Sequence, residues 1–223
     1  MPFSKIEQPQ SFKQHAYEKI KNAIIDHQIL PGEPLFERNL SESLGISRTP
    51  IREAIQLLEL EGWVQSIPRK GTFVCNISRQ DVEEVLQLRK ANEALVMELL
   101  IPTITEEKME DIDRIYGHQS VEKENNQRFI SIDKDFHIYL AELSGNRRLA
   151  QYMQTLSDQM RWFGIQALNL PDRAEQTLHE HAVIIEGIKN RDVEQAKQAV
   201  IEHIDRTREA VLSVLHTIKE ADR

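Results

Sequence analysis

The uneven distribution of proline and glycine is the feature that most constrains how this chain can fold. In the first third, these residues divide the chain into short segments, for example at "LPGEPL" (30–35) and at Gly62. Proline lacks a backbone N–H and glycine loses much conformational freedom on folding, so neither readily continues a helix. From Gln80 onward both become sparse, and apolar residues recur at helical spacing. We therefore expect a mainly helical protein with two domains, residues 1–76 and residues 77–223.

The distribution of charge also separates these two predicted domains. The chain of 223 residues carries a formal net charge of −8. Residues 1–76 contain nine Lys/Arg and nine Asp/Glu, so the whole excess of acidic groups lies in residues 77–223. This asymmetry indicates two parts with different partners, and it argues against a generally polybasic nucleic-acid binder.

The cysteine content and the hydropathy pattern indicate a cytoplasmic protein. Cys75 is the single cysteine, which excludes an internal disulfide and fits a reducing compartment. No apolar run approaches the length needed to span a membrane, and the stretch from Met1 to Gln14 lacks the apolar core of a signal peptide. We therefore expect no membrane partner.

The segments of the N-terminal domain follow the order of a winged helix-turn-helix. A helix over about 11–28 precedes the turn at 30–35, and a short helix over 36–44 then ends at Gly45. Ser47 is placed to cap the next helix, which carries a proline in its first turn. The sequences "VQSI" and "TFVC" then predict two short strands around the basic turn "PRKG".

In such a motif the second helix enters the major groove of DNA, so its first residues are the candidate base readers. The planar fork of arginine suits guanine edges and phosphate oxygens, and a serine hydroxyl can bond a phosphate. Arginine on the preceding helix and basic residues in the wing suit the DNA backbone or the minor groove, and a wing glycine permits close approach. The alternative is a small helical domain with surface arginines. The predicted DNA contacts are Arg38, Ser47, Arg48, Thr49, Arg52, Arg69, Lys70 and Gly71.

The C-terminal domain is predicted to be an antiparallel bundle of six or seven helices. The stretch 101–127 is polar and loosely patterned, so its helix is the least defined. The predicted helices lie near 79–100, 104–117, 125–144, 146–168, 172–190 and 192–218.

Polar residues occupy the inward faces of three of these helices. On a helical wheel of 125–144, Asp133 and His137 fall on the side of Phe136, whereas Asp135 falls on the polar side. His181 lies at the centre of the apolar face of its helix, and His203 lies on a stripe of small apolar residues. An inward histidine is either a hydrogen-bonded core residue or a ligand, because a buried polar group needs a partner.

Three inward histidines with one carboxylate favour a metal site. Residues four apart on a helix can hold one ion together, as Asp133 and His137 are spaced. Histidine nitrogens with a carboxylate oxygen suit zinc, and they also suit nickel or manganese. The predicted metal ligands are Asp133, His137, His181 and His203.

The helix over 79–100 carries a further polar group on its inward arc. Arg89, Asn92 and Glu93 lie among valines and leucines there. A buried arginine needs an anion, and Glu93 is one turn away, so a structural salt bridge is one reading. The other reading is that Arg89 receives the carboxylate of a small ligand through two hydrogen bonds. Arg89, Asn92 and Glu93 are therefore the candidate effector-binding residues.

The sequence also resembles a known family. The run "SRTPIREA…L…EG" within residues 12–75 is similar to the DNA-binding domain of the GntR family of bacterial transcription regulators. The segments "RKANE", "DKDFHIYLAELSGNRRL" and "EHAVIIEGIKNRDVEQAKQAVIEH" resemble the FCD effector domain of its FadR-type branch. The resemblance implies a helical bundle in which the four ligands named above hold a divalent metal beside a small-carboxylate pocket.

The expected function is that of a homodimeric transcription regulator that acts as a repressor. We do not expect an enzyme. Its winged helices would bind a near-palindromic operator, and a small organic acid beside the metal would control that binding. Three alternatives stay open at this point: the ion itself is the signal, the metal is structural with an unrelated effector, or the open metal site activates water in a metal-dependent hydrolase.

Overall fold

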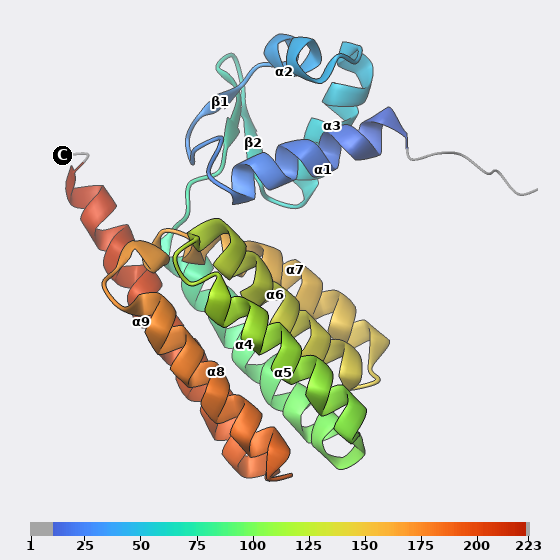
Figure 1. Ribbon diagram of the computed structural model, residues 1–223. Helices are drawn as coiled ribbons and strands as arrows, with labels where there is room; N and C mark the ends of the chain where they lie inside the picture. The colour runs from blue at the N-terminus through green and yellow to red at the C-terminus, as the bar shows by residue number, and fades with distance from the viewer. Residues whose placement is uncertain (1–10, 222–223) are drawn as a thin grey trace, which may run out of the picture. The chain divides into compact units, whose positions relative to one another are not determined.

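The computed structural model describes residues 11–221, so residues 1–10 and 222–223 of the two predicted domains lie outside this range. The described chain forms two compact units, and the boundary between them falls between Asn76 and Ile77. Helices dominate, and a small antiparallel sheet occurs only within the first unit of the described chain, which confirms the predicted fold class (Figure 1).

The N-terminal unit consists of three helices and a three-stranded sheet. The sheet is antiparallel in the order β1-β3-β2, and β3 is therefore the central strand. In its core, Ile20 and Ile24 of the first helix and Ile51 and Leu58 of the third are fully buried. The elements are α1 (Phe12–Ile25), β1 (Pro34–Leu35), α2 (Glu37–Leu44), α3 (Arg48–Leu60), β2 (Val64–Ile67) and β3 (Gly71–Val74).

The ends of these elements follow the local chemistry of the sequence. Gly45 ends α2 with φ +67, a left-handed conformation that costs glycine little. Strand β1 lies within the segment 30–35, for which the sequence predicts only a turn. It pairs with β3 alone and is therefore an edge strand, a position that tolerates the missing N–H of Pro34.

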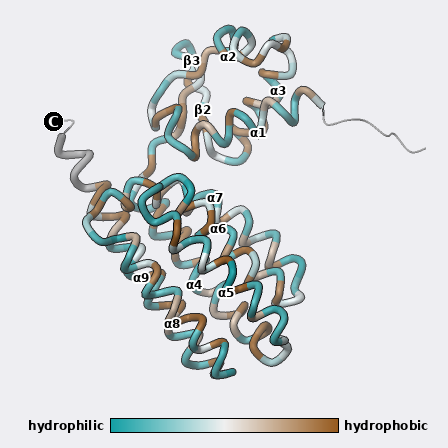
Figure 2. Tube along the Cα trace, in the orientation of Figure 1, coloured by the Kyte–Doolittle hydropathy of each residue, from teal (hydrophilic) through white to brown (hydrophobic). Residues whose placement is uncertain are grey.

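The C-terminal unit is a bundle of six long helices whose axes run along one another (Figure 1). Hydrophobic and hydrophilic residues alternate along each of them (Figure 2), as expected for helices that bury one face. No helix among the described residues has the length and apolar character needed to cross a membrane. The helices are α4 (Arg79–Leu100), α5 (Glu106–Val121), α6 (Asn126–Leu143), α7 (Arg147–Gly164), α8 (Arg173–Lys189) and α9 (Val193–Ala221), with short 3-10 turns at Ile101–Thr103 and Ala167–Asn169.

Helix α5 is better defined than its sequence pattern indicated. It begins after Thr105, whose hydroxyl accepts a hydrogen bond from the backbone N–H of Lys108. It continues to Val121, four residues beyond the predicted end at 117. Its inward residues include Met109 and Gln119, and the buried glutamine lies within the added turn.

Helices α8 and α9 approach each other closely at a glycine. A Cβ atom on Gly187 would lie 2.9 Å from the Cα and the backbone nitrogen of Ala196, closer than ordinary van der Waals contact. The two helices carry His181 and His203, so the close contact between small residues helps to hold these histidines in one place.

Candidate functional site

The predicted DNA contacts all lie at the surface of the N-terminal unit. Ser47 occupies the N-cap position of α3, as predicted, but its side chain makes no capping hydrogen bond within the described chain. Arg48, Thr49 and Arg52 occupy the first turns of α3 and are exposed. The set of eight predicted contacts is therefore accessible to a partner.

Two arginines of α2 and α3, Arg38 and Arg52, pair with acidic neighbours. Arg52 donates to both carboxylate oxygens of Glu37, at 2.9 and 2.7 Å, and so ties α3 to α2. This hydrogen bonding lowers the pKa of Glu37. Arg38 forms a weaker pair with Glu42, 3.6 Å apart, and both side chains are exposed. Arg52 thus has a structural contact that must be separated experimentally from any contact with DNA.

The wing is a tight hairpin with a basic tip. Strand β2 ends at Ile67 and β3 begins at Gly71, and the backbone N–H of Lys70 donates to the carbonyl of Ile67 at 3.0 Å. Arg69 has φ +66 and Gly71 has φ +116, so two of the residues around the tip adopt left-handed backbone conformations. Arg69 and Lys70 are both exposed.

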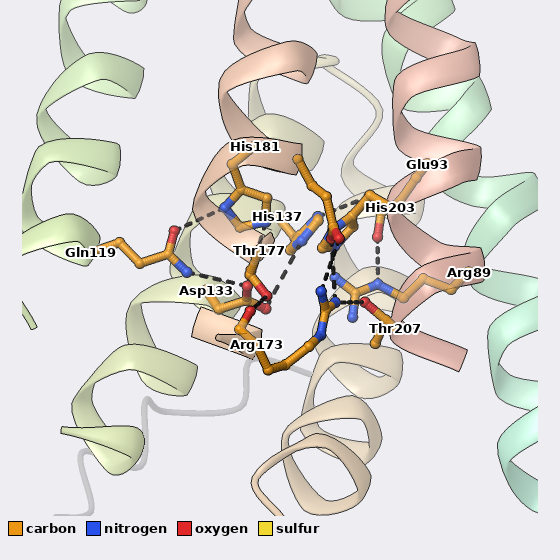
Figure 3. Close-up of polar contacts among 11 residues, drawn as sticks. Arg89, Glu93, Gln119, Asp133, His137, Arg173, Thr177, His181, His203 and Thr207 are labelled. Atoms are coloured by element: carbon orange, nitrogen blue, oxygen red, sulfur yellow. Dashed lines mark hydrogen bonds and ion pairs between the residues drawn. The ribbon is translucent and has the colours of Figure 1, made fainter. Parts of the chain in front are cut away.

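In the C-terminal unit, three histidines from three helices converge in the interior of the bundle (Figure 3). His137 comes from α6, His181 from α8 and His203 from α9, and each is at most 4% exposed. One ligand atom from each ring lies within 4.8 Å of those of the other two. The structure thus brings together three of the four predicted metal ligands in a single cluster.

Each imidazole is oriented by a different partner on its Nδ1 atom. His137 Nδ1 donates to Glu93 at 2.8 Å and His203 Nδ1 donates to Glu180 at 2.7 Å. His181 Nδ1 donates to the side-chain oxygen of Gln119 at 2.8 Å. Since carboxylate and amide oxygens are acceptors, each ring carries a proton on Nδ1. In the neutral form of such a ring the lone pair lies on Nε2.

The two deepest rings are neutral and have a free electron pair. Burial lowers the pKa of His137, and it lowers the pKa of His181 well below its ordinary value, so both rings are uncharged at neutral pH. The Nε2 atoms of both rings are buried and have no hydrogen-bond partner among the described residues. Two such atoms in one place are costly unless something binds them.

The carboxylate of Asp133 lies beside these nitrogen atoms. Its oxygens are 3.4 Å from His181 Nε2 and 3.9 Å from His137 Nε2. The side-chain N–H of Gln119 donates to the same carboxylate at 3.2 Å, so one amide positions both Asp133 and His181. Neutral imidazole nitrogens next to a carboxylate are a donor set that fits a divalent ion such as zinc.

The polar residues of α4 take different positions. The guanidinium of Arg89 pairs with Glu93, so the salt bridge considered from the sequence is present. Burial alone would raise the pKa of Glu93, but the charge of Arg89 and the hydrogen bond from His137 outweigh it and lower this pKa. The Asn92 amide instead donates to the carbonyl of Leu88 on its own helix at 2.7 Å, and Asn92 does not line the cavity described below.

A cavity of about 40 Å³ adjoins the cluster on the side of Arg89, Asp133 and His203. Arg89 Nη2 and Ser157 Oγ are buried polar atoms of its lining residues, and neither has a hydrogen-bond partner within the described part of the chain. The remaining wall combines apolar side chains, basic side chains, two threonine hydroxyls and a glycine: Phe129, Ile130, Lys134, Met160, Arg161, Gly164, Ala167, Leu168, Arg173, Thr177 and Thr207. The lining can therefore accept a small anion with an apolar part.

Three residues around the cluster were not identified from the sequence. Arg173 and Glu180 form a buried ion pair at 2.8 Å, and they share the inward stripe of α8 with Thr177, which is a signal that the sequence contains. Gln119 gave no such signal, because the predicted helix ended at 117.

The N-terminal unit has the exposed helices and basic wing of a DNA-binding domain, and the helical bundle holds a buried histidine cluster. This combination defines a class of protein: transcription regulators that join a DNA-binding domain to a ligand-binding domain. Two family models match the chain: "Bacterial regulatory proteins, gntR family" over residues 12–74, and "FCD domain" over residues 84–206. The protein belongs to the GntR family of bacterial transcription regulators and has an FCD domain. Members of this family are regulators, not enzymes.

Two relatives match nearly the whole chain. The HTH-type transcriptional regulator YdhC of Bacillus subtilis is 31% identical, covering 97% of this chain and 98% of its own. The HTH-type transcriptional repressor RspR of Escherichia coli is 26% identical, covering 92% and 91%. Among solved structures, E. coli McbR/YncC is 18% identical with a TM-score of 0.80, covering 93% of this chain and all of its own, which supports the fold alone.

Proposed function

We propose that this protein is a homodimeric repressor whose operator binding is controlled by a small carboxylate bound beside a divalent ion, zinc, in the helical domain. Asp133, His137, His181 and His203 would hold the ion, and Arg89 would receive the carboxylate. The winged helix would bind each half of a near-palindromic operator through the eight exposed residues named above.

One observation carries the proposal: the histidine cluster and the cavity beside it both contain residues with buried polar atoms that have no hydrogen-bond partner in the described chain. The Nε2 atoms of His137 and His181 lie on one side, and the Nη2 atom of Arg89 and the hydroxyl of Ser157 belong to residues that line the adjoining cavity. Buried polar groups are normally paired, so this concentration favours a ligand site over a purely structural core. The proposed divalent ion and the guanidinium of Arg89 would both attract an anion, and a carboxylate can bind to both groups.

A leucine stripe on α4 supports the homodimer. Leu88, Leu95 and Leu99 are 56%, 39% and 36% exposed, whereas most large apolar side chains of this unit are buried. Together with Asn92 they repeat at alternating intervals of four and three residues, which is the spacing of a helix–helix seam. We therefore assign this stripe to contact with a second copy of the chain.

A thermal-shift screen of small carboxylates, with and without prior removal of metal by a chelator, tests the proposed control. A ligand that binds the native state raises the melting temperature by mass action. A shift for a particular acid that disappears after chelation is the expected result. Shifts that survive chelation would assign the metal a structural role, and operator binding that follows zinc concentration without any acid would make the ion itself the signal.

A further inference from the structure

Two arginine–glutamate–histidine chains end at the histidine cluster. Figure 3 labels both arginines, both histidines and Glu93. In the first, Arg89 donates to one oxygen of Glu93, and the other oxygen accepts from His137 Nδ1 at 2.8 Å. In the second, Arg173 donates to both oxygens of Glu180, at 2.8 and 3.2 Å, and Glu180 accepts from His203 Nδ1 at 2.7 Å.

The two chains have the same order of residue types and run between the same two places, the cavity and the histidine cluster. Both arginines line the cavity, and both histidines belong to the cluster that could hold an ion. All six side chains are at most 5% exposed, so water does not screen the charges along either chain. The third imidazole, His181, differs because its partner Gln119 is a neutral amide that bonds Asp133 rather than an arginine.

We infer that an anion in the cavity and a divalent ion on the histidine cluster bind cooperatively, that the two chains carry this coupling, and that a dicarboxylate is the class of anion best suited to contact both arginines. The inference rests on the function proposed above and specifies how its two ligands communicate.

Charge sharing along each chain provides the mechanism. Each glutamate divides its negative charge between a buried arginine and an imidazole N–H, and Glu180 also lies 3.9 Å from the exposed guanidinium of Arg206. An anion that accepts hydrogen bonds from the arginine weakens the hold of that arginine on the glutamate. The glutamate then binds the imidazole N–H more strongly, and the Nε2 atom of that ring becomes a better electron-pair donor. By linkage, the ion increases the affinity for the anion by the same factor.

The test measures the Kd of Zn²⁺ by competition with a chromophoric chelator, in the presence and absence of succinate, for the full-length protein. Succinate should tighten zinc binding by roughly fivefold or more in the wild type. Glu93→Gln and Glu180→Gln keep an acceptor for each imidazole but remove the shared charge, so this factor should fall towards one in both. Gln119→Ala is the matched control: it should weaken zinc binding and keep the factor.

Arg89→Lys provides a second route if a glutamine variant does not fold. It retains a cation for Glu93 and removes the guanidinium fork, so the factor by which succinate tightens zinc binding should fall towards one. Glutamine variants or an Arg89→Lys variant that keep the wild-type factor would overturn the inference and place the coupling in direct contact between anion and ion.

The proposed function can hold even if the coupling fails, and the two measurements distinguish these cases. A wild-type protein whose zinc affinity is the same with and without succinate would overturn the coupling, even where a carboxylate raises the melting temperature and so upholds the proposed function. If no carboxylate in the thermal screen changes the melting temperature, the proposed function and the coupling are both removed.

Discussion

At the scale of single residues, the buried imidazoles depend on acceptors that come from other helices. Helical periodicity placed Asp133, His137, His181 and His203 on inward faces, because periodicity reports which side of a helix is buried. It could not assign the partners of the Nδ1 atoms, because each partner lies on another helix. Glu93 on α4 accepts from His137 on α6, and Gln119 on α5 accepts from His181 on α8. Such contacts depend on the packing of the bundle and not on any local pattern.

His181 offers a test of the metal assignment at this scale. Replacing His181 with alanine should reduce the zinc content of the purified protein well below that of the wild type, because it removes one nitrogen donor and the anchor of Gln119. Metal analysis by mass spectrometry measures this content. His179→Ala is a matched control on the exposed side of the same helix and should keep the wild-type content. Full retention of zinc in His181→Ala would show that the metal binds elsewhere.

The pair formed by Arg52 and Glu37 allows a sharper test of the DNA assignment. Arg52→Ala should weaken operator binding in a gel-shift assay by an amount typical of a lost base or phosphate contact, about 1–3 kcal/mol. Glu37→Gln weakens the same ion pair without removing the guanidinium, so operator binding should stay unchanged or increase.

The opposite pattern would revise the role of Arg52. Equal losses in Arg52→Ala and Glu37→Gln would mean that the pair acts by fixing α2 against α3, and that Arg52 does not contact DNA. The melting temperatures of both variants serve as the control for folding.

At the scale of elements, the sequence predicted most helices but misjudged segments whose signal is weak. Most helices were recovered with small shifts at their ends, as α6 (Asn126–Leu143) against the predicted 125–144. The two-residue strand β1 was missed because a strand of that length has no periodicity and owes its place to pairing with β3. Helix α5 lacked a clear pattern because few of its residues are buried.

The contact of α8 with α9 at Gly187 makes a prediction at this scale. Gly187→Ala would usually stabilise a helix, by up to about 1 kcal/mol, but here the added Cβ meets the backbone of Ala196 at 2.9 Å. Forced separation of the two helices should cost roughly 1–3 kcal/mol, so a net loss of stability is expected. Thermal unfolding monitored by circular dichroism measures it.

Gly117 is the matched control for this substitution. It also lies within a helix, and a Cβ atom there would meet nothing within 4 Å. Gly117→Ala should therefore leave the melting temperature unchanged or raise it. A Gly187→Ala variant as stable as Gly117→Ala would show that α8 and α9 separate without cost.

At the scale of the whole molecule, the proposed dimer links the leucine stripe of α4 to DNA binding. Leu95→Glu places a charge in the stripe and should shift the protein towards monomer in analytical ultracentrifugation. It should also weaken binding to a two-half-site operator while binding to a single half-site is retained, because a monomer engages one half-site only. Val121→Glu, at an exposed apolar position on α5, is the control. A dimer that persists in Leu95→Glu would place the interface on another surface.

The most direct test of the central claim, metal-dependent control of DNA binding by a carboxylate, is the operator affinity itself. Fluorescence anisotropy would be measured on an operator selected from random duplexes with this protein, using the acid that gives the largest thermal shift. In the zinc-loaded protein that acid should weaken operator binding roughly fivefold or more, and the change should disappear when the metal is removed. An effect of the acid that is the same with and without metal, or no effect in the zinc-loaded protein, would contradict the account.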